Sequence, residues 1–368
     1  MMRIGKFTDF YRDVTKAGTK IPQEKYLKVG HYPVIDQGRQ AIVGRWDSDD
    51  GICKEIPAII FGDHTRAIKY IEEPFFIGAD GVKILRPVNV QDNPKYLYYA
   101  LQAARIPNLG YSRHFKALKE LDFHVCSIEK QDEIVRILEK IDYLIEQCHE
   151  EDSCLNQIVK SRFIELFGDP DVNSKGWNEC ALSEKLNVVG GYAFKSDQFD
   201  EERGIPVLRI GNINAGFFRP VNLVYWHEDE SLERYIVYPG ELVMSLTGTV
   251  GKDDYGNVCI LGDDYGKYYL NQRNAKLEIV EGIDKYYLSQ LLKFEQIKKR
   301  LTGISRGVRQ ANISNKDILN LVVPVPPMEI QEQFSAFVAQ TDKSKLAVQQ
   351  GLQELETLKK SLMQQYFG

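Results

Sequence analysis

The stretch "SRFIELFG" at residues 161–168 has a counterpart 200 positions later, in "SLMQQYFG" at residues 361–368. Residues 128–168 align with residues 328–368 without a gap, and eight of the 41 positions are identical. The shared beginning, the shared end and the absence of gaps predict an internal repeat. The identical pairs are Glu129/Glu329, Gln131/Gln331, Asp142/Asp342, Leu155/Leu355, Lys160/Lys360, Ser161/Ser361, Phe167/Phe367 and Gly168/Gly368.

The similarity continues upstream of both segments. Leu118 aligns with Ile318 at the same offset, as do Leu121 with Leu321 and Val125 with Val325. Nearer the N-terminus, Pro33-Val34-Ile35 resembles Pro206-Val207-Leu208. There the separation has fallen from 200 to 173 positions, so the second copy carries 27 additional residues in its globular part. The chain therefore consists of two copies of one larger unit.

Both aligned segments have the apolar periodicity of a coiled coil. Their apolar residues recur in alternating steps of four and three, which places them on one narrow helical seam. Glu at the second position and Gly at the end are typical helix boundaries. We predict helices at residues 129–167 and 329–367, each roughly 58 Å long, packed antiparallel on each other; separate burial in two domains is the alternative. The seam residues include Ile134, Leu138, Ile141, Ile145, Phe334, Val338, Leu352 and Leu355.

Further apolar residues of the two segments lie off this seam. A large apolar side chain left exposed on a long helix suggests an additional binding partner. We therefore predict that the helix pair is also a docking surface for other proteins. The off-seam residues are Tyr143, Leu144, Phe163, Ile164, Leu346 and Leu358.

The two remaining ranges, residues 1–127 and 169–327, are predicted to be globular. Short β-type runs such as "AIIFG" and "ELVMSL" alternate with helical stretches such as "KYLYYALQAA". This pattern predicts an α+β fold for each. No signal peptide and no apolar stretch of membrane-spanning length is present, so we expect a cytoplasmic protein without membrane contact. The six cysteines form no CxxC pair, and we expect free thiols and no metal site.

Charge is distributed unevenly along the chain. The net charge is −5 overall, but +4 in residues 1–127, −5 in residues 128–168, −3 in residues 169–327 and −1 in residues 328–368. The first globular range is thus mildly basic, whereas the second is acidic on average. Any DNA-binding surface on the second range must be formed locally.

Motifs of the common catalytic classes are absent. The only approach to a Walker A loop, "GTVGKD" at residues 248–253, has the wrong glycine spacing and lacks Ser or Thr after the lysine. The single Pro-Pro pair does not form the Asn/Asp-Pro-Pro-aromatic motif of adenine methyltransferases, and no lysine follows an acidic residue by two positions, as in metal-dependent nucleases. We predict that this chain is not an enzyme.

Polar clusters in the second globular range are candidate DNA contacts. The "SLTGTVGK" segment offers Thr247, Thr249 and Lys252 for a phosphate, although a hairpin turn is an equally good interpretation. In "LNQRNAKL", predicted to begin a strand, Asn271 and Gln272 can pair with adenine and Arg273 with guanine; a polar strand edge would have the same sequence. Arg306 and Arg309 lie in a basic, glycine-containing stretch.

The first globular range has comparable clusters. These clusters lie between the predicted strands and helices, in stretches of small, polar or basic residues. Such stretches are typical of loops, and loops often carry binding residues. The candidates are Gln37, Arg39, His64, Thr65, Arg66, Arg113 and Lys116.

Two variable globular ranges, each followed by a similar long helix, resemble the specificity subunit of type I restriction–modification systems. The motif "VPVPPMEIQEQF" before the last helix, its counterpart "FHVCSIEKQDEI", and the "FG" that closes both helices carry the resemblance, which covers the whole chain. In the first copy Cys126-Ser127 replaces Pro326-Pro327.

The resemblance implies that residues 1–127 and 169–327 are target-recognition domains for double-stranded DNA. Residues 128–168 and 328–368 would be the conserved helical regions, which dock two modification subunits. Those subunits would bind S-adenosylmethionine and methylate adenine, and a complex that also cleaves DNA would require a restriction subunit with ATP and magnesium. This chain would bind no cofactor or metal of its own.

The same layout leads to a prediction about the target. Two similar domains with different loops, held apart by a helix pair, would recognise a bipartite, asymmetric DNA site. Two alternatives from other classes remain. The first alternative is a fused nuclease and methyltransferase, and the absence of the corresponding motifs argues against it. A coiled-coil scaffold that binds only proteins would show no salt-dependent affinity for random DNA.

Overall fold

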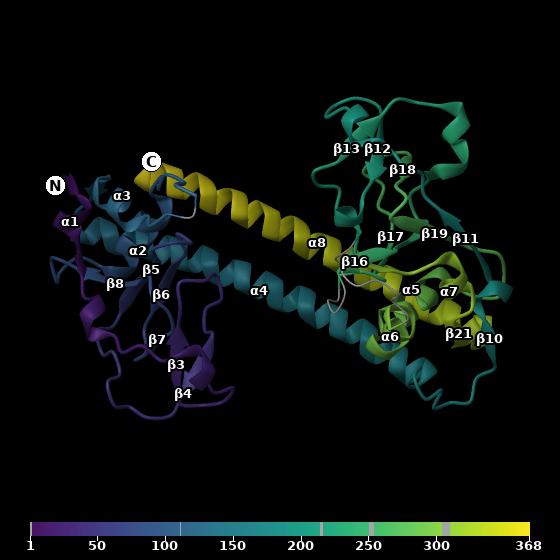
Figure 1. Cartoon of the computed structure of the whole chain (residues 1–368), viewed down its shortest axis with the longest axis horizontal. Coiled ribbons are helices and arrows are strands. Elements are labelled where there is room, and N and C mark those ends of the chain that lie inside the picture. The colour runs from purple at the N-terminus through teal and green to yellow at the C-terminus, as the bar shows by residue number, and fades with distance from the viewer. Residues whose placement is uncertain (1, 111, 214–215, 250–253, 304–309) are drawn as a thin grey trace. The chain divides into compact units, whose positions relative to one another are not determined.

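The computed structural model describes residues 2–110, 112–213, 216–249, 254–303 and 310–368. The chain divides into two compact units (Figure 1). Unit 1 consists of Met1–Glu150 and Gln349–Gly368, and unit 2 consists of Glu151–Val348. Each unit therefore contains one globular range together with a part of both long helices.

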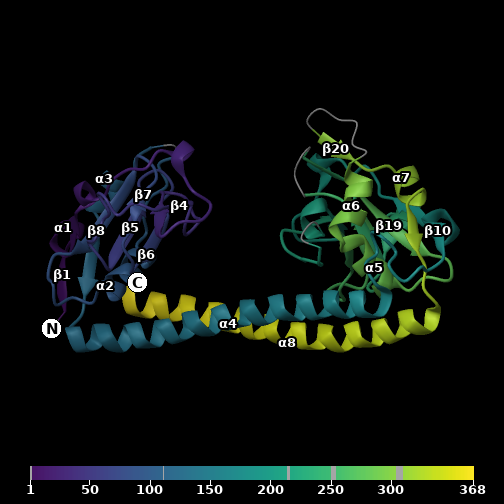
Figure 2. The ribbon, with the colours of Figure 1, turned by 90° about the horizontal axis from the view of Figure 1, so that it is seen from below.

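The two predicted long helices are present. Helix α4 spans Ile128–Phe167 and helix α8 spans Met328–Phe367, within one residue of the expected limits. Within each unit the two helices lie alongside each other and run in opposite directions (Figure 2). In unit 1, Lys359 Nζ lies 2.5 Å from Asp142 Oδ1. In unit 2, the rings of Phe163 and Phe334 are 5.5 Å apart. The antiparallel arrangement is confirmed, and separate burial of the helices is wrong.

Unit 1 is built on short β-sheets covered by helices. Its four-stranded antiparallel sheet has the order β2 (Tyr11–Asp13), β8 (Val82–Pro87), β5 (Ala58–Gly62), β6 (Ile68–Ile71). A three-stranded sheet has the order β4 (Gly44–Trp46), β3 (Tyr32–Ile35), β7 (Phe76–Ile77). A ribbon pairs β1 (Arg3–Lys6) with β9 (Asp122–Val125). The helices are α1 (Phe7–Phe10), α2 (Pro94–Ala103) and α3 (Phe115–Lys119).

Unit 2 contains the corresponding sheets in the same order. The four-stranded sheet is β11 (Leu186–Gly190), β19 (Asn274–Ile279), β15 (Leu242–Ser245), β17 (Val258–Ile260). The second sheet is β13 (Val224–Trp226), β12 (Ile205–Leu208), β18 (Tyr268–Leu270), β14 (Ile236–Val237). A ribbon pairs β10 (Glu179–Ala181) with β21 (Val322–Pro324). The helices are α5 (Lys285–Lys293), α6 (Glu295–Thr302) and α7 (Asn315–Leu319).

The repeat therefore extends through both globular parts. β3 pairs antiparallel with β4 and parallel with β7, and β12 does the same with β13 and β18. The similar tripeptides Pro33-Val34-Ile35 and Pro206-Val207-Leu208 lie in β3 and β12. In the described residues, unit 2 additionally has β14, α6 and a ribbon of β16 (Thr247–Thr249) with β20 (Gln310–Asn312). These elements contribute to the greater length of the second copy.

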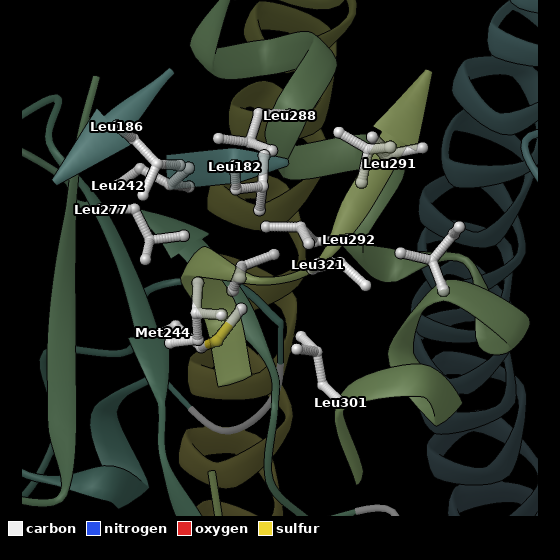
Figure 3. Packing of buried hydrophobic residues seen from close by; sticks show 14 of the residues in the cluster. Leu182, Leu186, Leu242, Met244, Leu277, Leu288, Leu291, Leu292, Leu301 and Leu321 are labelled. Atoms are coloured by element: carbon white, nitrogen blue, oxygen red, sulfur yellow. The ribbon is translucent and has the colours of Figure 1, made fainter. Parts of the chain in front are cut away.

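Both long helices contribute to the core of each unit. In unit 2, leucines of α5 and of the four-stranded sheet meet in one cluster (Figure 3), which also includes Phe163 and Phe334 from the long helices. In unit 1, Ile134 and Leu138 of α4 belong to the core, and Phe367 of α8 packs against it. Since burying one such side chain stabilises a fold by about 1.5–3 kcal/mol, the helices and globular parts depend on each other.

This burial corrects part of the predicted docking surface. Ile134, Leu138, Ile141, Phe334 and Val338 are buried within the chain, whereas Ile145, Leu352 and Leu355 are only partly exposed. The buried five cannot contact another subunit, because the chain's own domains and the opposite helix already cover them. Among the off-seam residues, Phe163 is fully buried, so its predicted exposure is wrong. The other five off-seam residues are exposed, led by Tyr143 at 58%.

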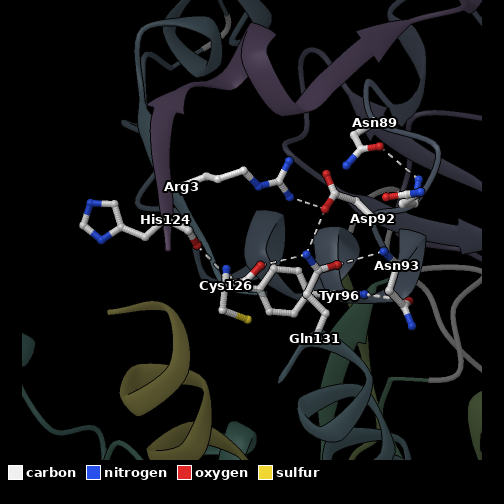
Figure 4. A network of polar contacts seen from close by, with 9 residues as sticks. Arg3, Asn89, Asp92, Asn93, Tyr96, His124, Cys126 and Gln131 are labelled. Carbon is white, nitrogen blue, oxygen red and sulfur yellow. Dashed lines mark hydrogen bonds and ion pairs between the residues drawn. The ribbon is translucent and has the colours of Figure 1, made fainter. Parts of the chain in front are cut away.

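A buried glutamine fixes each globular part to its long helix. In unit 1, Gln131 Nε2 donates to the Cys126 carbonyl (3.0 Å), and Gln131 Oε1 accepts from the Asn93 N–H (2.8 Å), as Figure 4 shows. In unit 2, Gln331 Nε2 donates to the Pro326 carbonyl (2.7 Å), and its Oε1 accepts from the Asp284 N–H (2.7 Å).

The residues bonded to these glutamines also match between the copies. Asn93 and Asp284 are the N-caps of α2 and α5. One turn later, Tyr96 donates its hydroxyl to the His124 carbonyl (3.3 Å), and Tyr287 donates to Pro324 (2.7 Å). The identity of Gln131 and Gln331 in the repeat thus reflects one shared junction, which we call the glutamine clamp.

Two smaller expectations concern cysteines and membranes. All six cysteines are free, and Cys53 and Cys259 are buried. Within the described ranges, His, Cys, Asp and Glu side chains form no group of three or more that could hold a metal ion. Among the same residues, no helix combines the length and apolar character needed to cross a membrane.

Candidate nucleic-acid interface

Among the described residues, the predicted DNA-contacting residues lie in loops and turns between the strands and helices of each unit. In unit 1 they lie after β3, between β5 and β6, and immediately before or within α3. In unit 2 they lie after β15, which corresponds to the place after β5, and between β18 and β19, which corresponds to the β7–β8 turn of unit 1. In unit 1 the fold thereby brings together residues that are distant in sequence, such as Gln37 and Arg113, which are 76 positions apart. The described loops and turns that carry these residues are called the recognition edge of each unit below.

Asp63 organises the recognition edge of unit 1. It directly follows β5 and is almost fully buried. Its N–H donates to the Gly81 carbonyl (2.7 Å), and its carbonyl accepts from the His114 N–H (2.8 Å). Its carboxylate accepts from the Phe115 N–H (2.7 Å), and its Oδ2 lies 4.0 Å from Arg113 Nε. Asp63 therefore connects the β5–β6 turn, the β7–β8 turn and the start of α3.

The imidazole of His114 strengthens this connection. The buried ring bonds through Nδ1 to the Asp63 carbonyl (2.9 Å), and its Nε2 accepts from the Leu109 N–H (3.1 Å). These partners require a neutral ring that carries its proton on Nδ1, because a carbonyl accepts and an N–H donates. Arg113, the residue immediately before, stays exposed on an anchored backbone.

Gln37, His64 and Thr65 lie together in unit 1. Gln37 Oε1 accepts from the His64 N–H (3.2 Å), and the Gln37 carbonyl accepts from the Thr65 hydroxyl. Gln37 can still donate through its side-chain amide, whereas the Thr65 hydroxyl proton is already used. The structure thus brings these three predicted residues together, with Gln37 in the centre.

The basic candidates of unit 1 differ in exposure. Arg39, Arg113 and Lys116 are exposed. Arg66 is half-buried, has a positive φ of 60°, and donates Nη1 to the Ile106 carbonyl (3.1 Å). Arg66 therefore holds the chain segment that leads to Arg113, and its direct contact with DNA stays a prediction.

The turn between β7 and β8 has a different charge from its counterpart in unit 2. In unit 1 it contains Asp80, which pairs with Lys20 (2.9 Å); the hydrogen bond from Lys20 lowers the pKa of the Asp80 carboxyl. In unit 2 the corresponding turn carries Arg273. Unit 1 also contains Lys69 in β6, whose pKa is lowered by burial, against the opposing effect of its hydrogen bond to Asp36. The two edges therefore present different charge patterns.

In unit 2, Asn271, Gln272 and Arg273 form a tight turn. The Asn271 carbonyl accepts from the Asn274 N–H (2.9 Å), and Asn271 Oδ1 accepts from the Arg273 N–H (3.2 Å). This corrects the prediction that the segment begins a strand, since β19 starts only at Asn274. The turn leaves the side chains of Gln272 and Arg273 exposed at the recognition edge.

The Thr247–Thr249 segment is a strand, β16, which pairs antiparallel with the distant β20. Thr249 donates both its N–H (2.7 Å) and its hydroxyl (2.9 Å) to Asp254. In this state both donors are used and a carboxylate lies beside them, so the predicted phosphate contact of Thr249 would require these bonds to be exchanged. Thr247 is half-buried at the edge. The candidates Lys252, Arg306 and Arg309 lie outside the described residues.

Two main-chain hydrogen bonds recur at the recognition edges of both units. The Asp63 bond to the Gly81 carbonyl (2.7 Å) corresponds to a bond from the Leu246 N–H to the Arg273 carbonyl (2.8 Å). The His114 bond to the Asp63 carbonyl (2.8 Å) corresponds to a bond from the Ile313 N–H to the Leu246 carbonyl (2.8 Å). Asp63 and Leu246 are thus equivalent, although their side chains have opposite character.

Three residues of the recognition edges are not among the candidates predicted from the sequence. Asp63 and His114 lie inside candidate segments but have no exposed head group, and Asn312 lies one residue before the buried Ile313. At the offset of 200 set by Leu118 and Ile318, Arg113 aligns with Ile313, so the sequence repeat misses Asn312 by one position.

Comparison with known proteins agrees with this architecture. The family described as type I restriction modification DNA specificity domain matches residues 3–153 and 174–357. The chain belongs to this family. The two matched ranges correspond to the two copies of the repeat. Membership of a specificity family also agrees with the prediction that the chain is not an enzyme.

Individual relatives extend over different parts of the chain. The type I restriction enzyme MjaVIII specificity subunit of Methanocaldococcus jannaschii is 24% identical, over 99% of this chain and 90% of its own length. The EcoBI specificity subunit of Escherichia coli is 25% identical over 51% of this chain and 38% of its own length. The crystal structure of the type I restriction–modification S subunit from M. genitalium has the same fold, with a TM-score of 0.62, 16% identity and coverage of 100% of this chain and 96% of that one.

Proposed function

We propose that this specificity subunit binds a bipartite, asymmetric DNA site, with one half recognised by each unit. The observation that carries the proposal is the repeated recognition edge: the same main-chain hydrogen bonds frame Asp63 and Leu246, but the surrounding side chains differ. Equivalent frames favour equivalent docking on two half-sites, and different side chains favour different sequences. The target is therefore asymmetric.

The long helices support the second part of the proposal, a fixed spacer. Each of α4 and α8 contributes to both units as one uninterrupted helix of 40 residues. Rigid attachment to such helices would keep the half-site centres at a constant spacing, about one helical turn or roughly 10 base pairs if both edges approach the same face of the duplex. Bases between the halves would be tolerated apart from the cost of bending.

Exposed apolar residues on the helices support docking of two modification subunits. In unit 1 they are Tyr143, Leu144 and Leu358, and in unit 2 they are Ile158, Ile164 and Leu346. The occurrence of such residues in both units fits one docking surface for each copy. In this assembly the modification subunits would bind S-adenosylmethionine, and a restriction subunit would supply the ATP- and magnesium-dependent steps. The complex would act in the cytoplasm, where the chromosome is.

Mapping methylated adenines tests the proposal. The chain is co-expressed with its modification subunit, and methylated sites are compared with those of a chimera that carries residues 1–127 of another family member. Residues 128–368 are kept, so that Gln131 of the glutamine clamp and both long helices remain those of this chain. The chimera should change one half of the site and preserve the other half and the spacer length.

A reciprocal exchange of residues 169–327 is the matched control and should change only the other half. A continuous or palindromic methylated site, or an exchange that alters both halves together, would contradict the bipartite arrangement. Failure of the chain to co-purify with the modification subunit would contradict docking. A scaffold that binds only proteins would co-purify but leave the DNA without a defined methylated sequence.

A further inference from the structure

One residue occupies the same position at both recognition edges. In unit 1 it is Arg113, which directly precedes His114, the donor to the Asp63 carbonyl. In unit 2 it is Asn312, which directly precedes Ile313, the donor to the Leu246 carbonyl. Since Asp63 and Leu246 both follow the equivalent central strands β5 and β15, Arg113 and Asn312 are structural counterparts.

Both residues combine an anchored backbone with an exposed side chain. The neighbours His114 and Ile313 are buried, at 1% and 3% exposure, whereas the side chain of Arg113 is 75% exposed and Asn312 is also exposed. Asn312 is further held by its pairing with Thr247 in the ribbon of β20 and β16. An exposed side chain on a fixed backbone loses less freedom when it binds, and its position relative to the ligand is defined.

The chemistry of the two side chains points to base recognition. Asp63 Oδ2 lies 4.0 Å from Nε of Arg113, so the carboxylate attracts the guanidinium, while 75% of the Arg113 side chain stays exposed. Arginine donates two hydrogen bonds to O6 and N7 of guanine, and asparagine pairs in the same bidentate way with N6 and N7 of adenine.

Contact with a phosphate explains these surroundings less well. The buried carboxylate of Asp63 lies directly behind Arg113 and opposes the approach of a second anion. Asn312 has no charge, and its cross-strand neighbour Thr247 has none either, so this position offers little attraction for a phosphate. Both positions are better suited to the neutral edge of a base.

We propose that Arg113 and Asn312 are paired specificity determinants: Arg113 recognises a guanine in the half-site bound by unit 1, and Asn312 recognises an adenine in the half-site bound by unit 2. This inference rests on the proposed function and deepens it, because it assigns one base pair of each half to one residue. Asp63 is the positioning residue for Arg113, and Leu246 provides the equivalent main-chain support for Asn312.

Selection from a pool of random duplex DNA tests the assignment. The full chain in complex with its modification subunit is the binding species, at one fixed salt concentration, and enriched sequences are compared among variants. The wild-type complex should prefer guanine at one position by roughly 5- to 150-fold over other bases. Arg113→Ala should abolish that preference and leave all other positions unchanged, while Arg113→Lys should retain part of it.

Substitution of Asn312 can change the preferred base as well as remove the preference. Asn312→Ala should abolish one adenine preference in the other half. Asn312→Asp should replace it by cytosine, since a carboxylate accepts from N4 of cytosine. A change in the preferred base cannot arise from partial unfolding. Lys116→Ala, an exposed change near Arg113, is the control and should weaken binding to all sequences equally.

Two results would overturn the assignment. If Arg113→Ala and Asn312→Ala weaken binding to every sequence alike and leave each base preference intact, both residues contact the backbone of the DNA. If the wild-type complex itself enriches no sequence, the proposed function fails and this inference fails with it; that outcome is distinguishable because it needs no variant.

Discussion

The recognition edges and the glutamine clamps are two regions in which the copies of the repeat can be compared. At the edges, the main-chain bonds recur but the side chains differ: Asp63 corresponds to Leu246, and Arg113 to Asn312. At the clamps, the side chain itself recurs, since Gln131 and Gln331 make the same two bonds. The backbone frame of the edge thus tolerates different side chains, whereas the attachment of each globular part to its helix depends on one particular amide.

The largest expected effect is a difference in stability between equivalent substitutions in the two long helices. Phe163 is fully buried in unit 2 and packs against four aromatic rings, including Tyr287 at 5.3 Å, whereas its counterpart Met363 is only partly buried in unit 1. Phe163→Ala should destabilise unit 2 by about 3–5 kcal/mol through loss of burial and creation of a cavity. Met363→Ala should cost unit 1 less than about 2 kcal/mol.

Scanning calorimetry measures both changes, with Ile164→Ala as the control. Ile164 follows Phe163 directly but is 43% exposed, so its removal should change stability by less than about 0.5 kcal/mol. Equal effects of Phe163→Ala and Ile164→Ala would show that α4 is not part of the core of unit 2.

An intermediate effect is expected at the clamps. Gln131→Met and Gln331→Met keep the size of the side chain but leave a buried N–H and a buried carbonyl without partners, at about 1–3 kcal/mol for each unsatisfied group. Gln131 also donates to the Asp92 carboxylate (2.9 Å), a bond for which no counterpart is found in the described part of unit 2. Gln131→Met should therefore be the more destabilising of the two.

Urea unfolding of the two variants checks this order. The exposed Gln333 on α8 provides the control, because Gln333→Met removes an amide of the same kind from a helix surface. A destabilisation by Gln331→Met that equals or exceeds that of Gln131→Met would contradict the stronger clamp in unit 1.

The smallest effect concerns reactivity rather than stability. Each globular part contains one buried cysteine, Cys53 in unit 1 and Cys259 in unit 2. Burial raises the pKa of the Cys259 thiol to about 12, and burial also raises the pKa of Cys53. Because the thiolate is the nucleophile and forms only as the pH approaches the pKa, neither should be alkylated by iodoacetamide at pH 8 in the folded chain. The exposed Cys154 should be labelled first.

Peptide mass spectrometry after limited labelling gives the order of reaction. Urea-denatured chain is the control, in which all six cysteines should react. Labelling of Cys259 before Cys154 in the folded chain would show that unit 2 opens readily around β17.

Much of the architecture could be predicted from the sequence because the helices repeat their apolar seam and their boundaries. Periodicity predicts one apolar face, however, and each long helix of this chain uses two: one toward the other helix and one toward a globular part. For that reason Phe163 was expected to be exposed, although it is buried against α5 and α8. The same limitation led to Ile134 and Phe334 being assigned to partner docking.

The recognition edge could be located from sequence only in part. Loop composition pointed to Gln37 and Arg113 in unit 1 and to Arg273 in unit 2, which lie in loops between the strands and helices; their contact with DNA stays a prediction. Composition does not show which polar side chains are already bonded within the fold. Arg66 bonds to a carbonyl 40 residues away, and Thr249 is bonded twice to Asp254. The bond of Arg66 depends on the tertiary arrangement of loops, which no local pattern encodes.

Unit 1 is made of two separate stretches of the sequence, and this affects how it can fold during synthesis on the ribosome. Unit 2 is one uninterrupted stretch, Glu151–Val348, whereas unit 1 also needs Gln349–Gly368, whose Leu362, Tyr366 and Phe367 pack against its core. Most of unit 1 is therefore synthesised first, but its core cannot be completed before Gln349–Gly368 is available. An N-terminal domain usually folds before the rest of the chain is made, whereas unit 1 can finish folding only after the last helix has been translated.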